Sequence, residues 1–454
     1  MQKLAGYCSI ILLFAAGAYG QGGGNAAITG TVTDPSGAVI AKANVVMTQI
    51  GTEVKRTATT NSNGQFNVPS LQPATYRLSV EAAGFKTYIQ DLTLLADQIG
   101  NLQIPMQLGT SAETVTVEAT ATLVNTVTPV LSQVIERSRM VELPLNGRNA
   151  ADLTKMVAGT VDSNNGAGTS QGNTKQVPGA EVISVNGARP DQVSYNLDGG
   201  TNQDLMSNTN NPFPFPDALQ EFSVQTNSFD TQYGTNAGAV VNVVTKSGTN
   251  QFHGNVFEFV RNREFNARNF FAAKVDPLKR NQFGGTVGGP IQKDKTFFFF
   301  GYQATRIRTA GNANNTILPT AANMTGDFSN YLTANSAVNP QGRVIQIKDP
   351  TTGQDISGNL IPPTSISPVA VNLSKYLPIS QALPNGRITY SVPSIQNLNE
   401  YVTKFDRVFR GQDKYFFRFY TDRFYLAPGY DGKDLLLTTA VGATINTQIG
   451  RAHV

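Results

Sequence analysis

Residues 400–426 read EYVTKFDRVFRGQDKYFFRFYTDRFYL, and their pattern decides the fold. Aromatic or β-branched residues alternate with charged ones in both halves: Tyr401, Thr403 and Phe405 against Glu400, Lys404 and Asp406, then Tyr415, Phe417 and Phe419 against Lys414, Arg418 and Asp422. Successive side chains of a strand point to opposite faces, so each half has one apolar and one charged face. This alternation is typical of transmembrane β-barrel strands, although strands of a soluble sandwich can show it as well.

The spacing of similar segments favours the barrel. Strands are expected near 252–261, 281–290, 296–308, 399–410, 414–426 and 436–448. Tight links at 292–295 and 411–413 alternate with long ones at 262–280 and 310–397, and outer-membrane barrels alternate short turns with long loops in this way. Because about eight strands are the minimum for a closed membrane barrel, we expect residues 251–454 to form a partial barrel and the chain to be the N-terminal part of a longer protein.

Composition excludes several classes of function. The 454 residues include 35 Lys and Arg against 31 Asp and Glu, and no basic run could follow nucleic-acid phosphates. One cysteine and two histidines leave little material for a disulfide framework, a zinc site or a Cys–His catalytic pair. No catalytic elbow, zinc-protease or calcium-loop motif is found. We therefore expect no enzymatic activity, no metal, no cofactor and no nucleic-acid partner.

Residues 1–20 have the order of a secretory signal peptide. Lys3 precedes the apolar run Ile10–Ala16, and small residues follow that fit cleavage after Ala18 or Gly20. The apolar run is shorter than the ~20 residues of a membrane-spanning helix, so we expect export, with a membrane anchor as the alternative.

Residues 26–108 predict a β-sandwich, because about seven short strands follow one another at intervals of roughly 8 to 12 residues. The phrases GTVTDPSG (30–37), NGQF (63–66), LQPATYRLSV (71–80) and AGF (83–85) resemble the carboxypeptidase regulatory-like domain. That resemblance implies a transthyretin-like or carbohydrate-binding-like fold. It also implies an accessory role as a spacer or docking module, with sugar binding as the alternative.

The linker at 109–123 contains one strand-like run without a predicted sheet of its own, formed by Glu113, Thr114, Val115, Thr116 and Val117. Taken alone, the run is an ordinary strand. Its position between two modules makes it resemble the TonB box of TonB-dependent receptors, although here a sandwich precedes it. The resemblance implies that it adds as a strand to the sheet edge of a TonB-type energy-coupling protein in the periplasm.

Residues 124–250 contain the phrases that carry most of the resemblance. They are LPLNGRN (143–149), ISVNGAR (183–189), YNLDGG (195–200), PDALQEFSV (216–224) and YGTNAGAVVNVVTKSGTN (233–250). They resemble the α+β plug domain of Oar-like TonB-dependent receptors. Their Asn-Gly and Asp-Gly pairs suit tight turns with positive φ. Arg148, Arg189 and Asp198 are candidate plug-to-barrel contacts, with solvated turn charges as the alternative.

The sequence thus predicts a mainly β chain with an N-terminal sandwich, an α+β plug and the first strands of an incomplete transmembrane barrel. The resemblance implies an outer-membrane receptor, in contact with membrane lipid and with its sandwich in the periplasm. It would import an unidentified extracellular ligand, with polysaccharide and peptide both open, driven by the TonB system. The alternatives are a carbohydrate-binding adhesion or structural protein without transport, and a truncated inactive fragment.

Overall fold

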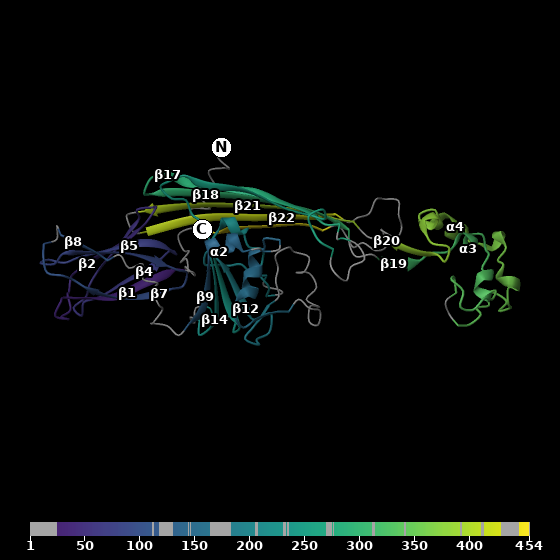
Figure 1. Cartoon of the computed structure of the whole chain (residues 1–454), viewed down its shortest axis with the longest axis horizontal. Helices are drawn as coiled ribbons and strands as arrows, with labels where there is room; N and C mark the ends of the chain where they lie inside the picture. The colour runs from purple at the N-terminus through teal and green to yellow at the C-terminus, as the bar shows by residue number, and fades with distance from the viewer. Residues whose placement is uncertain are drawn as a thin grey trace, which may run out of the picture.

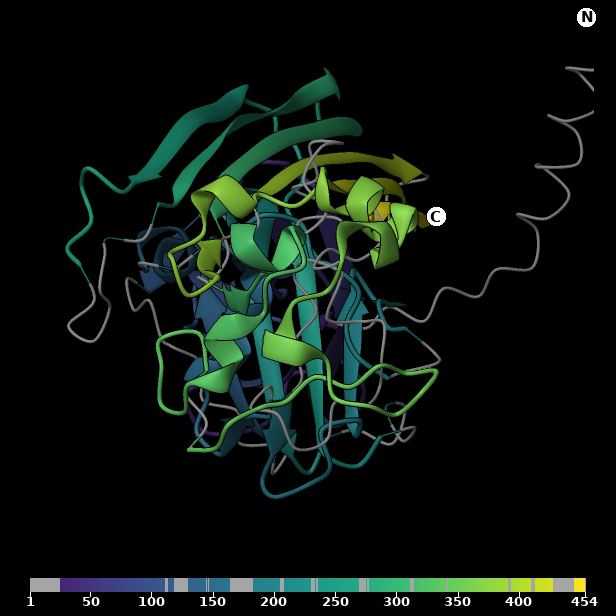
Figure 2. The same ribbon diagram turned by 90° about the vertical axis from the view of Figure 1, so that its right-hand side faces the viewer.

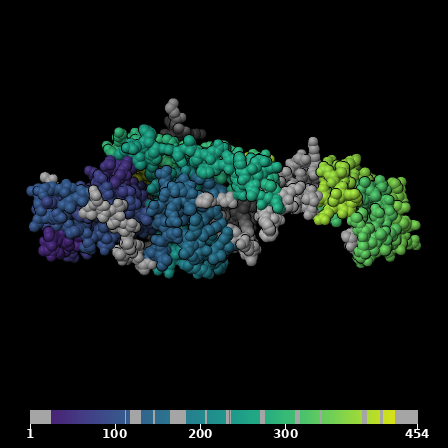
Figure 3. Space-filling view, viewed as in Figure 1, coloured from purple at the N-terminus to yellow at the C-terminus, as the bar shows by residue number. Residues whose placement is uncertain are grey.

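Strands dominate the chain, and its regular elements form four parts (Figure 1). The computed structural model describes residues 25–110, 113–117, 130–143, 145, 147–163, 183–204, 208–229, 233, 236–268, 275, 277–310, 314–339, 342–390, 393–409, 413–427 and 445–453. We call the parts the N-terminal domain (to 117), the central domain (from 130), the curved sheet (from 253) and the distal domain (314–390). The N-terminal and central domains lie side by side under the curved sheet, and the distal domain projects from its far end (Figure 3).

The N-terminal domain packs two sheets around one apolar core. Their strand orders are β4–β1–β7 and β3–β2–β5–β6–β8. The strands are β1 (Ala26–Thr33), β2 (Asn44–Gln49), β3 (Lys55–Thr59), β4 (Gln65–Leu71), β5 (Ala74–Glu81), β6 (Thr87–Leu94), β7 (Ile99–Pro105) and β8 (Thr114–Val117). Alternate positions of β1 and β5 are buried, which directs side chains such as Val32 and Leu78 into the core.

The strand predicted in the linker belongs to this domain. β8 pairs in parallel with β6, with Thr114 opposite Thr87 and Val117 opposite Gln90. From sequence the segment has no sheet of its own; in the structure it covers the edge of β6. Strand pairing over a distance in sequence leaves no local signal, and an open edge is a favourable place for a strand because its backbone groups need partners.

The central domain is built on a five-stranded sheet with the order β13–β12–β15–β14–β9, beside a two-stranded sheet of β10 and β11. Its elements are β9 (Leu131–Glu136), α2 (Arg137–Glu142), η2 (Ala150–Met156), β10 (Thr160–Asp162), β11 (Ile183–Val185), β12 (Val193–Leu197), β13 (Gly200–Thr201), η4 (Pro216–Ala218), β14 (Leu219–Asn227) and β15 (Ala239–Thr245). β14 and β15 are buried on both faces. The apolar run 240–244 predicts this burial for a strand covered on both sides.

The curved sheet has six antiparallel strands in the order β16–β17–β18–β21–β22–β23. They are β16 (His253–Asn262), β17 (Lys279–Gln292), β18 (Thr296–Ala310), β21 (Pro393–Phe409), β22 (Asp413–Ala427) and β23 (Ile445–His453). The first five lie close to their predicted positions. The sixth is expected at 436–448, and the described part of that range belongs to β23, in which Ile445 lies opposite Leu426. Residues 428–444 lie outside the described part of the chain.

The two faces of the curved sheet differ in chemistry. The concave face arches over the central domain (Figure 2). It buries Glu400, Lys404, Asp406, Arg418 and Asp422, whereas the outer face exposes Phe300, Phe405, Phe417, Phe419 and Tyr425. This is the period-two alternation predicted from residues 400–426.

The distal domain occupies the long link between β18 and β21, where a loop is expected from sequence. Its elements are β19 (Asn314–Ile317), α3 (Ala321–Met324), η6 (Ser329–Leu332), η7 (Ser357–Asn359), η8 (Pro363–Ser365), α4 (Pro368–Ser374), η9 (Ile379–Gln381) and β20 (Arg387–Tyr390). The buried amide of Asn339 donates to the carbonyls of Tyr331, Thr333 and Arg343. Such side-chain bonds satisfy an irregular backbone without a periodic sequence pattern. Within the described residues, we find no helix with the length and apolarity to cross a membrane.

Candidate functional site

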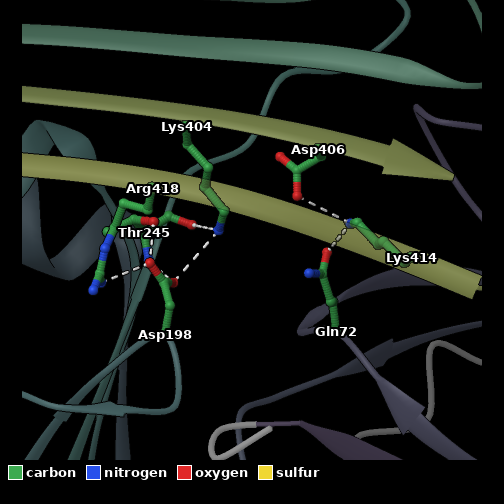
Figure 4. Close-up of polar contacts among 7 residues, drawn as sticks. All are labelled: Gln72, Asp198, Thr245, Lys404, Asp406, Lys414 and Arg418. Atoms are coloured by element: carbon green, nitrogen blue, oxygen red, sulfur yellow. Dashed lines mark hydrogen bonds and ion pairs between the residues drawn. The ribbon is translucent and has the colours of Figure 1, made fainter. Parts of the chain in front are cut away.

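The central domain meets the curved sheet through a buried ionic cluster centred on Asp198 (Figure 4). One carboxylate oxygen lies 2.9 Å from an Arg418 guanidinium nitrogen, and the other lies 3.4 Å from Lys404 Nζ. The amide and hydroxyl of Thr245 donate to the same carboxylate at 2.8 and 2.6 Å. The three charged side chains are at most 4% exposed. The cluster therefore joins β21 and β22 to the central domain through groups shielded from solvent.

Asp198 compensates a pair of like charges on the sheet. Lys404 and Arg418 lie directly opposite each other on β21 and β22. Like charges in this arrangement repel, and the repulsion grows when water is excluded. Burial alone would raise the pKa of Asp198, but Lys404, Arg418 and the Thr245 donors lower it to about 2. The carboxylate is therefore ionised at neutral pH.

A tight turn between β12 and β13 positions the Asp198 carboxylate. Asp198 has φ 47° and Gly199 has φ 82°, the left-handed conformation that Asp-Gly pairs accept. The Asp198 amide donates to the Val243 carbonyl at 2.8 Å, which ties the turn to β15. The Asp-Gly motif seen in the sequence thus presents a carboxylate at the end of the central sheet.

Arg148 and Asp217 form a second buried ion pair, within the central domain. The Arg148 guanidinium carbon lies 4.0 Å from the ring centroid of Phe259 and 5.2 Å from that of Phe257, both on β16. Asn255 of β16 donates to Asp217 at 2.6 Å. Burial lowers the pKa of Arg148, although Asp217 opposes this effect. The pair therefore contacts the curved sheet through two aromatic rings and one amide.

An apolar cluster lies between these two polar contacts. Its buried members are Phe215, Ala218, Phe299, Val402 and Tyr420, from both sides of the interface. Gly301 of β18 allows the close approach, because a Cβ at this position would lie 3.0 Å from Phe215 Cζ. The central domain is therefore held by shape as well as by charge.

The N-terminal domain contacts the central domain through the loop between β6 and β7. The Ala96 amide donates to the Glu221 carboxylate at 2.6 Å, and Asn242 donates to Asp97 at 2.7 Å. Burial raises the pKa of Glu221 to about 8; the Ala96 amide opposes this shift, whereas the carboxylates of Glu136 and Asp97 add to it. The contact thus contains a buried carboxylate whose charged neighbours are also acidic.

The N-terminal domain also reaches the curved sheet. Gln72 accepts a hydrogen bond from Lys414, which also lies 3.4 Å from Asp406 (Figure 4). A cavity of about 250 Å³ lies where the three parts meet, lined in part by Gln72, Thr245 and Lys404. The N-terminal domain therefore contacts both the central domain and the curved sheet, at one end of the sheet.

A second cavity, of about 260 Å³, lies between the central domain and the half of the sheet nearer the distal domain. Its lining includes Arg148, Arg280, Gln303, Glu400 and Asp422. Gln303 Oε1 and Asp422 Oδ1 are buried there without a hydrogen-bond partner among the described residues. Across the described ranges, no three His, Cys, Asp or Glu side chains form a group that could hold a metal ion.

The predicted contact residues have different surroundings. Asp198 and Arg148 lie at the interface with the curved sheet. The side chain of Arg189 is 77% exposed, and its ion pair, at 2.7 Å, is with Asp191 of the same turn. Arg189 is thus placed as a solvated turn charge.

The predicted TonB-box-like residues form β8 and the residue before it. Glu113 pairs with Lys86 at 2.7 Å, and its carbonyl accepts a hydrogen bond from the Thr87 amide at 2.9 Å. The side chains of Thr114 and Thr116 are exposed, and that of Val115 is half-buried. The segment is therefore accessible from solvent while it is paired with β6.

Comparisons with known proteins agree with this architecture. A family model described as outer membrane beta barrel domain matches residues 244–453, and the carboxypeptidase regulatory-like domain matches residues 27–107. The TonB-dependent transporter Oar of Myxococcus xanthus is 26% identical over 310 residues, which are 64% of this chain and 27% of Oar. The chain is thus similar to this TonB-dependent transporter, and its residues 244–453 match an outer-membrane barrel domain. It spans about a quarter of the length of that curated relative.

Two solved structures share less with this chain. One is a mutant ferric enterobactin receptor of Pseudomonas aeruginosa in complex with enterobactin, which is 10% identical. The match covers 71% of this chain and 37% of the receptor chain, with a TM-score of 0.41. The other is hydroxyquinol 1,2-dioxygenase of Pseudomonas putida DLL-E4, which is 10% identical. The match covers 19% of this chain and 57% of the dioxygenase chain, with a TM-score of 0.17. Both scores are too low to establish a common overall fold.

The matched barrel domain and the similarity to the TonB-dependent transporter Oar support an outer-membrane location. Several interface residues of this chain are not identified from sequence. Lys404 and Arg418 are recognisable only as charges on the polar face of amphipathic strands, without a partner. Asp217 and Glu221 lie inside a phrase that resembles the plug, but no local signal distinguishes a buried carboxylate from an exposed one.

Proposed function

We propose that the chain functions in an outer-membrane receptor that imports an extracellular ligand through a plugged β-barrel, driven by a TonB-type protein. In this proposal the central domain is the plug, and the curved sheet is part of the barrel wall. The distal domain faces the outside, and the N-terminal domain lies in the periplasm after export by the signal peptide at 1–20. The unidentified ligand enters from the distal side.

The observation that carries the proposal is the chemistry of the interface between the central domain and the curved sheet. Asp198 binds two cations of the sheet, and Arg148 and Asp217 contact β16 through rings and an amide. Polar groups at such a contact can exchange their partners for water when the domain moves, whereas an exposed apolar core cannot. A polar, charge-complementary contact therefore suits a plug that must be held and then displaced.

The energy-coupling step provides the test. We expect the full chain, purified in detergent, to bind the periplasmic domain of the TonB protein from its own organism. Thr116→Pro in β8 should weaken this binding about tenfold or more, because proline removes a backbone donor. Thr59→Pro, in β3 at the opposite edge of the same sheet, is the matched control and should bind like the unmodified chain. Equal binding by both variants would contradict the role of residues 113–117, and no binding by the unmodified chain would favour the adhesion alternative.

A further inference from the structure

β8 is the outermost strand of its sheet in the described part of the chain. One of its edges pairs with β6, and it lies at the end of the N-terminal domain away from the curved sheet (Figure 1). We infer that the coupling partner adds its own strand to the outer edge of β8 while β8 stays paired with β6. The N-terminal domain would then hold the coupling strand in place as part of the complex. This inference rests on the proposed function and specifies how its partner is bound.

The hydrogen bonding of β8 determines which backbone groups face outward. The Glu113 carbonyl accepts from the Thr87 amide, so the backbone groups of Glu113 face β6. Both polar groups of one strand residue point to the same side, and successive residues alternate. Val115 and Val117 therefore also direct their backbone groups to β6, whereas Thr114 and Thr116 direct theirs to the open edge. Their two amides and two carbonyls are what an added strand requires.

The two edges of this sheet differ in side-chain character. The opposite edge strand, β3, carries Lys55 and Arg56, and charged side chains commonly protect an edge against added strands. β8 has the sequence Thr-Val-Thr-Val, and the acidic residue before it is neutralised by Lys86 at 2.7 Å. The β8 edge is therefore the one suited to accept a strand.

Pairing with β6 also prepares β8 for binding. Fixing the backbone of a free residue costs about 1–2 kcal/mol, and a disordered segment would lose that freedom on binding. β8 is already extended and aligned over the pairs from Thr87–Thr114 to Gln90–Val117. A partner strand that adds to the outer edge benefits from this order, whereas one that first removes β8 from β6 must break existing backbone bonds.

A reversible lock distinguishes the two modes of binding. Ile89 and Thr116 lie directly opposite each other on β6 and β8. Neighbouring strands are about 4.8 Å apart, within the Cα separation that a disulfide spans. The full chain with Cys8→Ser, Ile89→Cys and Thr116→Cys can therefore be compared oxidised and reduced. The control lock, Thr75→Cys with Thr93→Cys, joins β5 to β6 at facing hydroxyls 3.2 Å apart, away from β8.

The affinity for the periplasmic domain of TonB decides between the modes. If the partner adds to the outer edge, the oxidised β6–β8 lock should bind within about twofold of its reduced form, as the control lock should. Loss of about tenfold or more on oxidation, reversed by a reductant and absent from the control lock, would show that β8 must leave β6 and would overturn the inference. If the unmodified chain does not bind, the proposed function fails, and the inference fails with it.

Discussion

The two surfaces of the central domain shift the pKa of a buried carboxylate in opposite directions. Against the curved sheet, Asp198 faces Lys404 and Arg418, and its pKa is lowered to about 2 despite burial. Against the N-terminal domain, Glu221 has acidic charged neighbours, and burial raises its pKa to about 8. Burial is common to both, so the sign of the neighbouring charges decides whether the carboxylate is ionised. The Asp198 carboxylate is ionised near neutral pH, while the Glu221 carboxyl still titrates there.

The largest effect is expected from removing the charge of Asp198. Asp198→Asn leaves Lys404 and Arg418 opposite each other, buried and uncompensated, which should destabilise the protein by about 3–5 kcal/mol. Denaturant unfolding of the full chain in detergent, followed by circular dichroism, measures this loss. Asp91→Asn, which breaks the exposed pair with Arg77, is the control and should cost about 0–1 kcal/mol. Equal losses in the two variants would contradict the role given to the Asp198 cluster.

The Glu221 contact should make the stability of the protein depend on pH. Glu221 holds its proton more tightly in the folded protein than a free glutamate does. Its contribution to stability is therefore full below the pKa of a free glutamate and is lost as the pH rises towards about 8. Each pKa unit is worth about 1.4 kcal/mol, so we expect a loss of a few kcal/mol.

Thermal unfolding of the full chain between pH 5 and pH 9 tests this sign. Glu221→Gln keeps an oxygen acceptor for the Ala96 amide but cannot titrate, so its melting temperature should fall less over this range. Parallel pH profiles for the two proteins would mean that Glu221 does not control the contact.

The shape of the sheet contact can be tested without changing a charge. Gly301→Ala places a Cβ 3.0 Å from Phe215 Cζ, so the ring or the strand must shift. Overpacking of this kind costs about 1–3 kcal/mol. Gly353→Ala in the distal domain is a poor comparison, since its φ is 72°. Gly342→Ala in the distal domain is a better control and should leave unfolding unchanged, because a Cβ there would lie 3.8 Å from its nearest neighbour, Asn335 Oδ1. A wild-type unfolding midpoint for Gly301→Ala would show that the contact tolerates this extra volume.

The smallest effect is expected at Arg189. Its pair with Asp191 is exposed, so Arg189→Ala should change stability by no more than about 0.5 kcal/mol. The same unfolding measurement applies. A loss as large as that of Asp198→Asn would mean that Arg189 contacts the curved sheet.

Sequence patterns predict the elements better than their partners. The period of two locates five strands of the curved sheet and the faces of Lys404 and Arg418, because alternation is a local property of a strand. The Asp198–Gly199 turn is also recognisable, since few residue pairs accept its φ values. That Asp198 meets those two cations depends on residues about 200 positions apart, and no local pattern records it.

Other features are missed for related physical reasons. β8 pairs with β6, from which β7 separates it in the sequence, so its sequence indicates a strand but not a sheet. Glu221 forms its hydrogen bond with the backbone of Ala96, and any residue except proline at position 96 would provide that amide. The distal domain is held by amides such as Asn339 and lacks both periodicities on which sequence-based assignment depends.

The distal domain enters and leaves the curved sheet at one place. Ala310 lies opposite Pro393 at the ends of β18 and β21, and β19 and β20 pair with each other just beyond. An insertion whose two ends are neighbours imposes little strain on its host. The distal domain can therefore be enlarged, replaced or deleted, by evolution or by design, while β18 and β21 keep their register.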